Sequence, residues 1–314
     1  MTFKNVNYSV VAMANVASTR SMPSHPSAGA ALELLKPITW FPPMWAFACG
    51  VVSSGTPVLS NWHLLLAGIA LSGPLVCGTS QAVNDWYDRH VDAINEPNRP
   101  IPSGRVPGRW GLYIAIVWSV LSLIVAGLIG PVVFWAAVFG LAAAWAYSAP
   151  PFRLKANGWW GNGAVGLCYE GLPWFTGAAA LLGGVPPWPI LALALLYSAG
   201  AHGIMTLNDF KAIEGDLRMG VRSLPVQLGV QGAARVASAV MALPQAVVVA
   251  LLFSWGKPLH AAAVLVLLAV QLLMMVRFLG DPKGRALWFS GLGVTLYVAG
   301  MMVSAFAVRG LMGV

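Results

Sequence analysis

Long apolar stretches alternate with polar connections along most of this chain of 314 residues. A helix that crosses a membrane needs roughly 17–25 predominantly apolar residues. Stretches that meet this requirement lie near 37–56, 62–83, 110–128, 130–149, 160–182, 187–207, 234–254, 258–279 and 287–308. The pattern therefore predicts an all-α integral membrane protein with about nine transmembrane helices.

The composition excludes most other classes of protein. Hydrophobic residues make up 58% of the chain and charged residues only 9%, against roughly 25% charged residues in ordinary soluble domains. A water-soluble globule of this size could not cover its surface with so few polar side chains. Residues 1–32 contain no long apolar run. We expect them to form a flexible cytoplasmic tail ahead of a single transmembrane domain at 33–314.

The distribution of positive charge predicts the orientation in the membrane. The chain has 18 Lys and Arg against 10 Asp and Glu, for a net charge of +8. In a soluble protein this excess would suggest a nucleic-acid partner. Here nearly all of the cations fall in the tail or on alternate connections, as the positive-inside rule requires. We therefore expect the lipid bilayer, and no nucleic acid, as a partner, with the N-terminus and the long connections in the cytoplasm.

Most of the acidic residues lie in two clusters at the cytoplasmic ends of predicted spans. The clusters are Asp85, Asp88, Asp92 and Glu96, and Asp209, Glu214 and Asp216. Each begins with Asn-Asp, at Asn84 and Asn208. Residues spaced i, i+3 and i+7 share one face of a helix, so the three Asp of the first cluster align. Asp209 and Asp216 align in the same way.

Aligned carboxylates at a membrane boundary need a cation to compensate them, because they repel one another and lose solvation. Ion pairs with Arg89, Arg99 and Arg105 are one explanation. Mg²⁺ explains more, because it binds carboxylate oxygens and typically bridges one or two of them to a substrate phosphate. Metal and basic side chains would together stabilise a departing diphosphate. A cavity among the helices would protect an allylic cation from water.

Three longer motifs resemble those of the UbiA-type intramembrane prenyltransferases, in particular the chlorophyll and bacteriochlorophyll synthase branch. They are NDWYDRHVDAINEPNRPIPSGR at 84–105, YSAPPFRLKANGWWGN at 147–162 and NDFKAIEGDLRMGVRSLP at 208–225. The resemblance extends from about Leu34 into the last predicted helix. It implies a UbiA-type bundle around a central cavity. It also implies Mg²⁺-dependent transfer of a geranylgeranyl or phytyl group from its diphosphate to the 17-propionate of bacteriochlorophyllide a.

The resemblance further implies where the enzyme works and which residues serve it. The implied location is the cytoplasmic or intracytoplasmic photosynthetic membrane, with the active site facing the cytoplasm. Association with other pigment-synthesis or assembly proteins is also implied. The implied metal ligands are Asn84, Asp85, Asp88, Asp92, Asn208, Asp209, Glu214 and Asp216, and the catalytic carboxylates among them are Asp85, Asp88, Asp92, Asp209 and Asp216. The implied diphosphate ligands are Arg99, Arg105, Arg153, Lys155, Lys211, Arg218 and Arg222. The chain has Ala212 where many members of the superfamily have an Asp, so Glu214 or Asp209 is expected to replace that ligand.

Three further residues are candidates for a pigment pocket. Glu170 falls near the middle of a predicted span, where a carboxyl group is costly and therefore a functional candidate. It would contact the polar edge of the macrocycle or form a hydrogen bond within the bundle. His202 would bind the central Mg of the pigment or serve in packing. Trp86 would line the pocket or pack in the core.

Two other classes of function remain open at this point. A prenyltransferase that acts on a quinone ring or on haem should lack the EPNRPIPSG and YSAPP segments. A transporter or pigment-binding protein is the second alternative, and a transporter should show inverted halves with charges near the midplane. An acceptor propionate, with a pKa near that of Glu at about 4.3, is ionised at neutral pH. Esterification would then need no general base, in keeping with the lack of a clear Ser-His-Asp arrangement.

Overall fold

The computed structural model describes residues 24–309 and 311, and in this part of the chain the regular elements are all helices. In chain order they are α1 (Ala28–Leu34), η1 (Pro37–Thr39), α2 (Phe41–Ser53), η2 (Leu59–Asn61), α3 (Trp62–Ala70), η3 (Leu71–Cys77), α4 (Gly78–Asn95), α5 (Trp110–Ile129), α6 (Pro131–Ser148), η4 (Leu154–Ala156), α7 (Gly158–Gly166), η5 (Leu167–Gly171), α8 (Leu172–Leu182), α9 (Trp188–Asp209), α10 (Ile213–Met219), α11 (Leu224–Ser254), α12 (Pro258–Gly280) and α13 (Pro282–Arg309).

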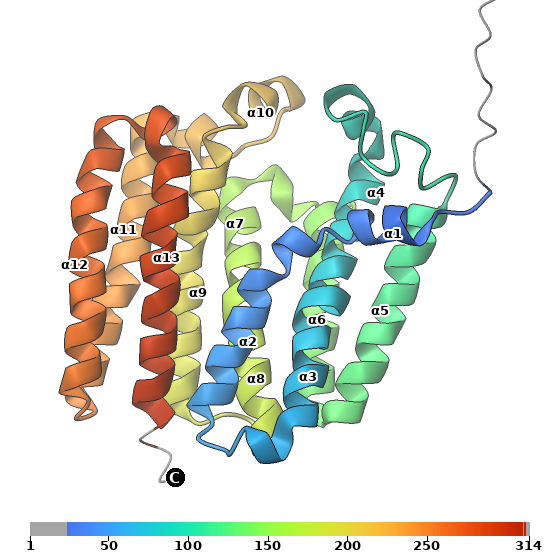
Figure 1. Cartoon of the computed structure of the whole chain (residues 1–314). Helices are drawn as coiled ribbons and strands as arrows, with labels where there is room; N and C mark the ends of the chain where they lie inside the picture. Colours follow the sequence, from blue (N-terminus) through green and yellow to red (C-terminus); the bar gives the residue numbers. More distant parts are fainter. Residues whose placement is uncertain (1–23, 310, 312–314) are drawn as a thin grey trace, which may run out of the picture.

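The long helices stand side by side in one bundle (Figure 1). Helix α9 packs against α7 and α11, and α13 packs against α12, α9 and α2. The last helix, α13, therefore lies beside α2, which is near the start of the chain. The short helix α10 and the C-terminal end of α4 lie at one end of the bundle, and the C-terminal end of α13 lies at the other (Figure 1). The prediction of an all-α membrane protein is confirmed.

Within residues 24–309 and 311, seven helical stretches are long and apolar enough to cross a membrane. They are Leu59–Asn95, Trp110–Ile129, Pro131–Ser148, Trp188–Asp209, Leu224–Ser254, Pro258–Gly280 and Pro282–Arg309. The two other predicted spans coincide with α2, which has 13 residues, and with the continuous run of α7, η5 and α8. The count of nine and the orientation of the N-terminus therefore stay predictions.

The packing of the bundle suits a lipid environment. Large apolar side chains point outwards, including Leu128, Leu259 and Leu287, which are all more than four-fifths exposed. Inside, glycines let helices approach closely. A Cβ atom on Gly177 would lie 2.1 Å from the carbonyl oxygen of Phe47, so α8 and α2 touch through their backbones.

The structure refines the sequence interpretation in two places. Residues 28–32, the last part of the predicted tail, belong to α1, whose Ala30 and Leu34 are buried; residues 1–23 lie outside the described part. The stretches η3 and η5 are π-helical, which the apolar pattern could not predict. Both contribute residues to the wall of a central cavity, and π-helical turns are frequent at functional sites.

Candidate active site

The first acidic cluster lies at the C-terminal end of α4. Asp85, Asp88 and Asp92 follow one another along its last turns, as their spacing predicts. Asp85 is only 1% exposed and Asp92 only 7%. The last turn of a helix carries partial negative charge, so the carboxylate of Asp92 adds to an unfavourable field. The arrangement therefore requires nearby cations.

Two cations from other segments meet this cluster. Lys36 Nζ lies 2.6 Å from Asp85 Oδ1. Arg99 Nη1 donates a hydrogen bond of 2.9 Å to Asp92 Oδ2 and lies 3.4 Å from Asp85 Oδ1. The same guanidinium donates two bonds of 2.8 Å to Glu96. Of the proposed ion-pairing partners, Arg99 therefore does compensate the carboxylates.

Lys155 reaches the middle carboxylate of the cluster from the loop between α6 and α7. Its Nζ lies 2.5 Å from Asp88 Oδ2, and Arg153 Nη2 lies 3.9 Å from Asp88 Oδ1. Burial lowers the pKa of Lys155, although the charge of Asp88 acts in the opposite direction. Lys36 and Arg153 both have left-handed backbones, with φ of 48° and 40°. Such backbones are costly for residues other than Gly and concentrate at functional sites.

The second acidic cluster lies at the C-terminal end of α9 and on α10, at the same end of the bundle. Asn162 Nδ2 donates a hydrogen bond of 3.0 Å to Asp209 Oδ2, which ties α7 to α9. Burial raises the pKa of Asp216, whereas Glu214 is exposed. Ala212 is the N-cap residue that precedes α10, and its carbonyl oxygen accepts a 2.8 Å bond from the backbone N–H of Asp216.

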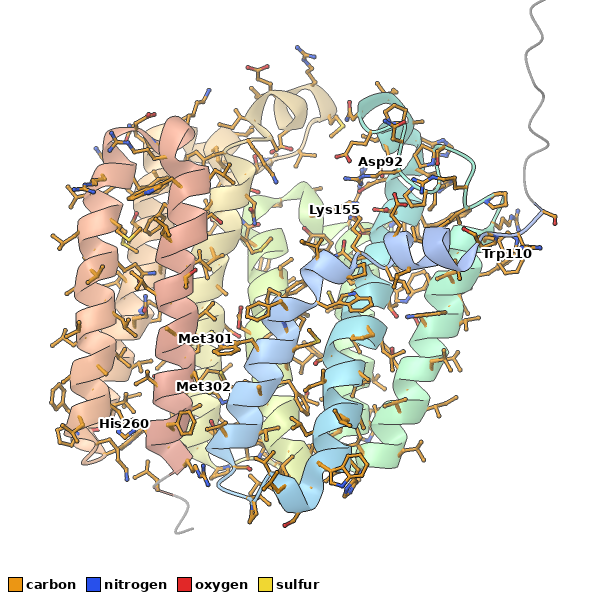
Figure 2. All side chains as sticks on the ribbon, viewed as in Figure 1. Asp92, Trp110, Lys155, His260, Met301 and Met302 are labelled. Atoms are coloured by element: carbon orange, nitrogen blue, oxygen red, sulfur yellow. The ribbon has the colours of Figure 1, made fainter. Side chains whose placement is uncertain are left out.

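An electrostatic link connects the two clusters. The hydrogen bond from Arg99 holds the pKa of Glu96 below its usual value, and the charges of Lys36 and Lys211 act in the same direction. Lys211 belongs to the loop of the second acidic cluster, so this loop lies within electrostatic reach of the first cluster. Figure 2 shows Asp92 and Lys155 at the same end of the bundle, far from His260 at the other.

Backbone hydrogen bonds join the loops that carry two of the predicted diphosphate ligands, Lys155 and Arg222. The N–H of Gly158 donates to the carbonyl of Arg222 at 2.8 Å, and the N–H of Arg222 donates to the carbonyl of Ala156 at 2.9 Å. Asn157 and Arg222 thereby form a parallel bridge. The bridge holds the two loops, and with them Lys155 and Arg222, in a fixed position relative to each other.

Replacing Gly158 by Ala is expected to weaken this bridge. The added Cβ would lie 2.6 Å from the backbone nitrogen of Leu224 and 3.0 Å from the carbonyl carbon of Ser223. Such overpacking typically costs about 1–3 kcal/mol, so we expect a lower melting temperature and a several-fold loss of activity. Thermal unfolding and turnover of the purified protein measure both.

Gly163→Ala is the matched control on the same helix. Its added Cβ would meet only His202 Cδ2, at an ordinary distance of 3.8 Å. An equal effect of both substitutions would show that helix α7, and not the loop bridge, is the sensitive feature.

A cavity of about 1030 Å³ lies beneath the two clusters. Asn84 and Asn208, the first residues of both acidic motifs, line it together with Tyr147. Deeper walls are mostly apolar and come from α2, α6, α9, α13 and the two π-helical segments. Met302, in the lower part of α13 in Figure 2, belongs to the wall. The prediction of a central cavity in the bundle is confirmed.

Some predicted site residues lie elsewhere. Arg105 is paired with Glu33 and also donates 2.6 Å to the carbonyl of Asn98, so it fastens α1 to the loop after α4. Lys211 and Arg218 are exposed beside and on α10. Arg89 lies 4.2 Å from the ring centroid of Trp86. These residues do not lie among the ion pairs around Asp85, Asp88 and Asp92.

The three pigment-pocket candidates are not brought together. Glu170 lines the central cavity. His202 lines a second, smaller hollow with Trp159 and Trp160, and its ring centroid is 5.6 Å from that of Trp159. Trp86 lines neither cavity.

The sequence interpretation missed Lys36 and Asn162 as site residues. Lys36 is the last charged residue before the first predicted span, and Asn162 closes the second motif. Those positions were the only available signals. Neither says which carboxylate the side chain reaches, because the pairing depends on how distant segments pack.

The donor set fits a hard cation such as Mg²⁺. Asp85 Oδ2 is buried and has no hydrogen-bond partner in the part of the chain that the structure describes. Within residues 24–309 and 311, no three His, Cys, Asp or Glu side chains converge as a ready-made cage. The unpartnered oxygen of Asp85 suits Mg²⁺, which uses one or two protein carboxylates and completes its shell with water and substrate phosphate.

An apolar cavity lined by the first residues of both acidic motifs, with ion-paired acidic and basic groups at the same end of a membrane bundle, suits an intramembrane enzyme that handles an anionic head group and a lipid-like tail. Comparison with known proteins agrees. Residues 40–307 match the UbiA prenyltransferase family. The chain belongs to this family and is a prenyltransferase.

Individual relatives agree with the family. The chain is 62% identical over 288 residues to the bacteriochlorophyll synthase 33 kDa chain of Cereibacter sphaeroides, covering 92% of this chain and 95% of the relative. It is 40% identical over 291 residues to chloroplastic chlorophyll synthase of Oryza sativa subsp. japonica, covering 88% and 76%. A UbiA homolog from Archaeoglobus fulgidus, solved bound to GPP and Mg²⁺, shares the fold with a TM-score of 0.69 at 21% identity, over 91% of this chain and all of that one.

Proposed function

We propose that this prenyltransferase transfers a geranylgeranyl or phytyl group from its diphosphate to the 17-propionate of bacteriochlorophyllide a, at the cytoplasmic face of a photosynthetic membrane. The observation that carries the proposal is the shared lining of one apolar cavity by Asn84 and Asn208, the opening residues of both acidic motifs. The relatedness to bacteriochlorophyll and chlorophyll synthases supports the choice of acceptor.

The basic residues around the first cluster would receive the diphosphate. Lys155, Arg153 and Arg99 come from two different loops and already neutralise carboxylates there. Asn84, Asp85, Asp88 and Asp92, with Asn208, Asp209 and Asp216, would hold Mg²⁺. When bound, Mg²⁺ supplies positive charge where negative charge develops on the leaving diphosphate.

The apolar walls would perform the remaining tasks. They accommodate the prenyl chain and exclude the water that would trap an allylic cation. The acceptor carboxylate, ionised at neutral pH, can attack without a base from the protein. The bond between the prenyl C1 and the diphosphate oxygen breaks, and the bond between C1 and the propionate oxygen forms.

One assay tests the proposal directly. The purified full chain in detergent or lipid nanodiscs, supplied with Mg²⁺ and geranylgeranyl diphosphate, is expected to convert bacteriochlorophyllide a to its geranylgeranyl ester with one diphosphate released per ester. Chelation of the metal should stop the reaction, and added Mg²⁺ should restore it. Reaction of a quinone precursor in place of bacteriochlorophyllide a would refute the choice of acceptor and leave the family assignment intact.

A further inference from the structure

Glu170 is the buried polar group of the cavity wall that the proposed reaction leaves without a role. It lines the cavity, is only 6% exposed, and its Oε2 has no hydrogen-bond partner in the described part of the chain. Two other polar residues of the wall have partners of their own. Gln81 Nε2 donates to Tyr169 Oη at 2.9 Å, and Asn84 Nδ2 donates to Ser148 Oγ at 3.3 Å. A buried polar atom without a partner is costly, so a ligand group is its natural complement.

The local backbone turns Glu170 towards the cavity. The residue lies in the π-helical segment Leu167–Gly171, which widens the helix by one residue. The next residue packs directly on α9, because a Cβ on Gly171 would lie 2.1 Å from Ser198 Oγ. The segment is therefore packed against α9 at Gly171, while Glu170 belongs to the cavity lining.

The depth of Glu170 limits what it can contact. Asn162 lies level with the second acidic motif, through its bond to Asp209. Glu170 follows Asn162 by eight residues of nearly continuous helix, which corresponds to about 12 Å along the axis. A group bound by Glu170 therefore lies well below the level at which the diphosphate leaves.

The chemistry of the Glu170 side chain indicates which ligand group it would contact. No Lys or Arg of residues 24–309 forms an ion pair with Glu170, and an isolated charge in an apolar wall is strongly disfavoured. A neutral carboxyl group offers one O–H donor. A prenyl chain is a hydrocarbon and has no acceptor for this hydrogen. The acceptor macrocycle does have carbonyl groups at its edge.

We propose that Glu170 is a specificity-determining residue that donates a hydrogen bond to the 3-acetyl carbonyl of the macrocycle. The inference rests on the proposed function. The acetyl group is farther from the 17-propionate than the ring ketone is, and so fits a donor deep in the cavity when the propionate lies near Asn84 and Asn208. Chlorophyllide a carries a vinyl group at this position and cannot accept the bond. Glu170 would thus favour bacteriochlorophyllide a.

The test compares three acceptors: bacteriochlorophyllide a, 3-acetylchlorophyllide a and chlorophyllide a. With geranylgeranyl diphosphate and Mg²⁺, Glu170→Leu is expected to lower kcat/KM by about tenfold for the two acetyl acceptors and to leave the vinyl acceptor unchanged. Glu170→Gln keeps a donor and should retain most of the preference. Thr176→Val, which removes a buried hydroxyl bonded to Leu172 outside the cavity wall, should not change the ratio between acceptors.

Other outcomes have definite meanings. An equal loss with all three acceptors, or an unchanged ratio in Glu170→Leu, would overturn the inference and leave Glu170 a structural residue. Failure of the unmodified chain to esterify any of the acceptors would instead refute the proposed function. Resonance Raman spectra of bound bacteriochlorophyllide a add a test that needs no turnover. The acetyl C=O stretch should lie at lower wavenumber in the unmodified chain than in Glu170→Leu, and equal frequencies would contradict the bond.

Discussion

Replacing Asp88 or Asp92 by Asn is expected to abolish prenyl transfer while the protein stays folded in the membrane. Either substitution removes one negative charge from the cluster and removes one carboxylate partner of Lys155 or of Arg99. It also removes an oxygen ligand for Mg²⁺, whose contribution to stabilising the leaving diphosphate is worth several kcal/mol. We therefore expect turnover to fall by about a thousandfold or more. Ester formation under saturating Mg²⁺ measures the loss.

A matched substitution separates this effect from a general change of charge. Asp281 precedes α13, where its Oδ1 accepts a 3.1 Å bond from the N–H of Gly284, and Asn can accept the same bond. Asp281→Asn should leave activity unchanged. Recovery of activity in Asp88→Asn or Asp92→Asn at high Mg²⁺ would indicate weakened metal affinity. Full activity of both variants at ordinary Mg²⁺ would contradict the metal role of the cluster.

The architecture could largely be predicted from the sequence. In a membrane protein, the length of each apolar stretch locates a helix, and the positions of the charged residues locate the connections between helices. The apolar stretches located the long helices, and the i, i+3, i+7 spacing correctly predicted that Asp85, Asp88 and Asp92 align on α4. The apolar pattern could not resolve the first predicted span. Its described helix α2 begins only at Phe41, after a left-handed Lys36 and a short 3₁₀ turn.

The pairing of side chains within the site could not be predicted. Lys36 and Asp85 are 49 positions apart, and Lys155 and Asp88 are 67 apart. A list of cytoplasmic cations does not say which of them will reach a given carboxylate. Arg99 and Arg105 illustrate this, since both follow the first cluster by a few residues. Arg99 bonds to Asp92, whereas Arg105 bonds to Glu33 of α1.

Because Lys155 is half-buried and paired with Asp88, its ammonium group should have a large effect on turnover. We expect Lys155→Gln to lower kcat/KM for the prenyl diphosphate by about a hundredfold, the usual scale for losing one preorganised charge at a developing anion. The acceptor concentration for half-maximal rate should change little, since the loss concerns the diphosphate. Lys155→Arg keeps the charge and should retain more activity than Lys155→Gln, although its fork geometry differs from that of an ammonium. Steady-state kinetics with each substrate varied in turn measure both variants.

Two comparisons decide whether Lys155 acts on the diphosphate or only compensates Asp88. Lys283→Gln removes an exposed cation outside the site and should leave the rates unchanged. In a double-mutant cycle, Asp88→Asn with Lys155→Gln should be about as impaired as Asp88→Asn alone if both residues serve one charged site. If Lys155 only neutralises Asp88, the double variant should be more active than Asp88→Asn, because removing both charges relieves the unpaired ammonium. That result would assign diphosphate binding to Arg99 and Arg153 and leave Lys155 a purely structural partner of α4.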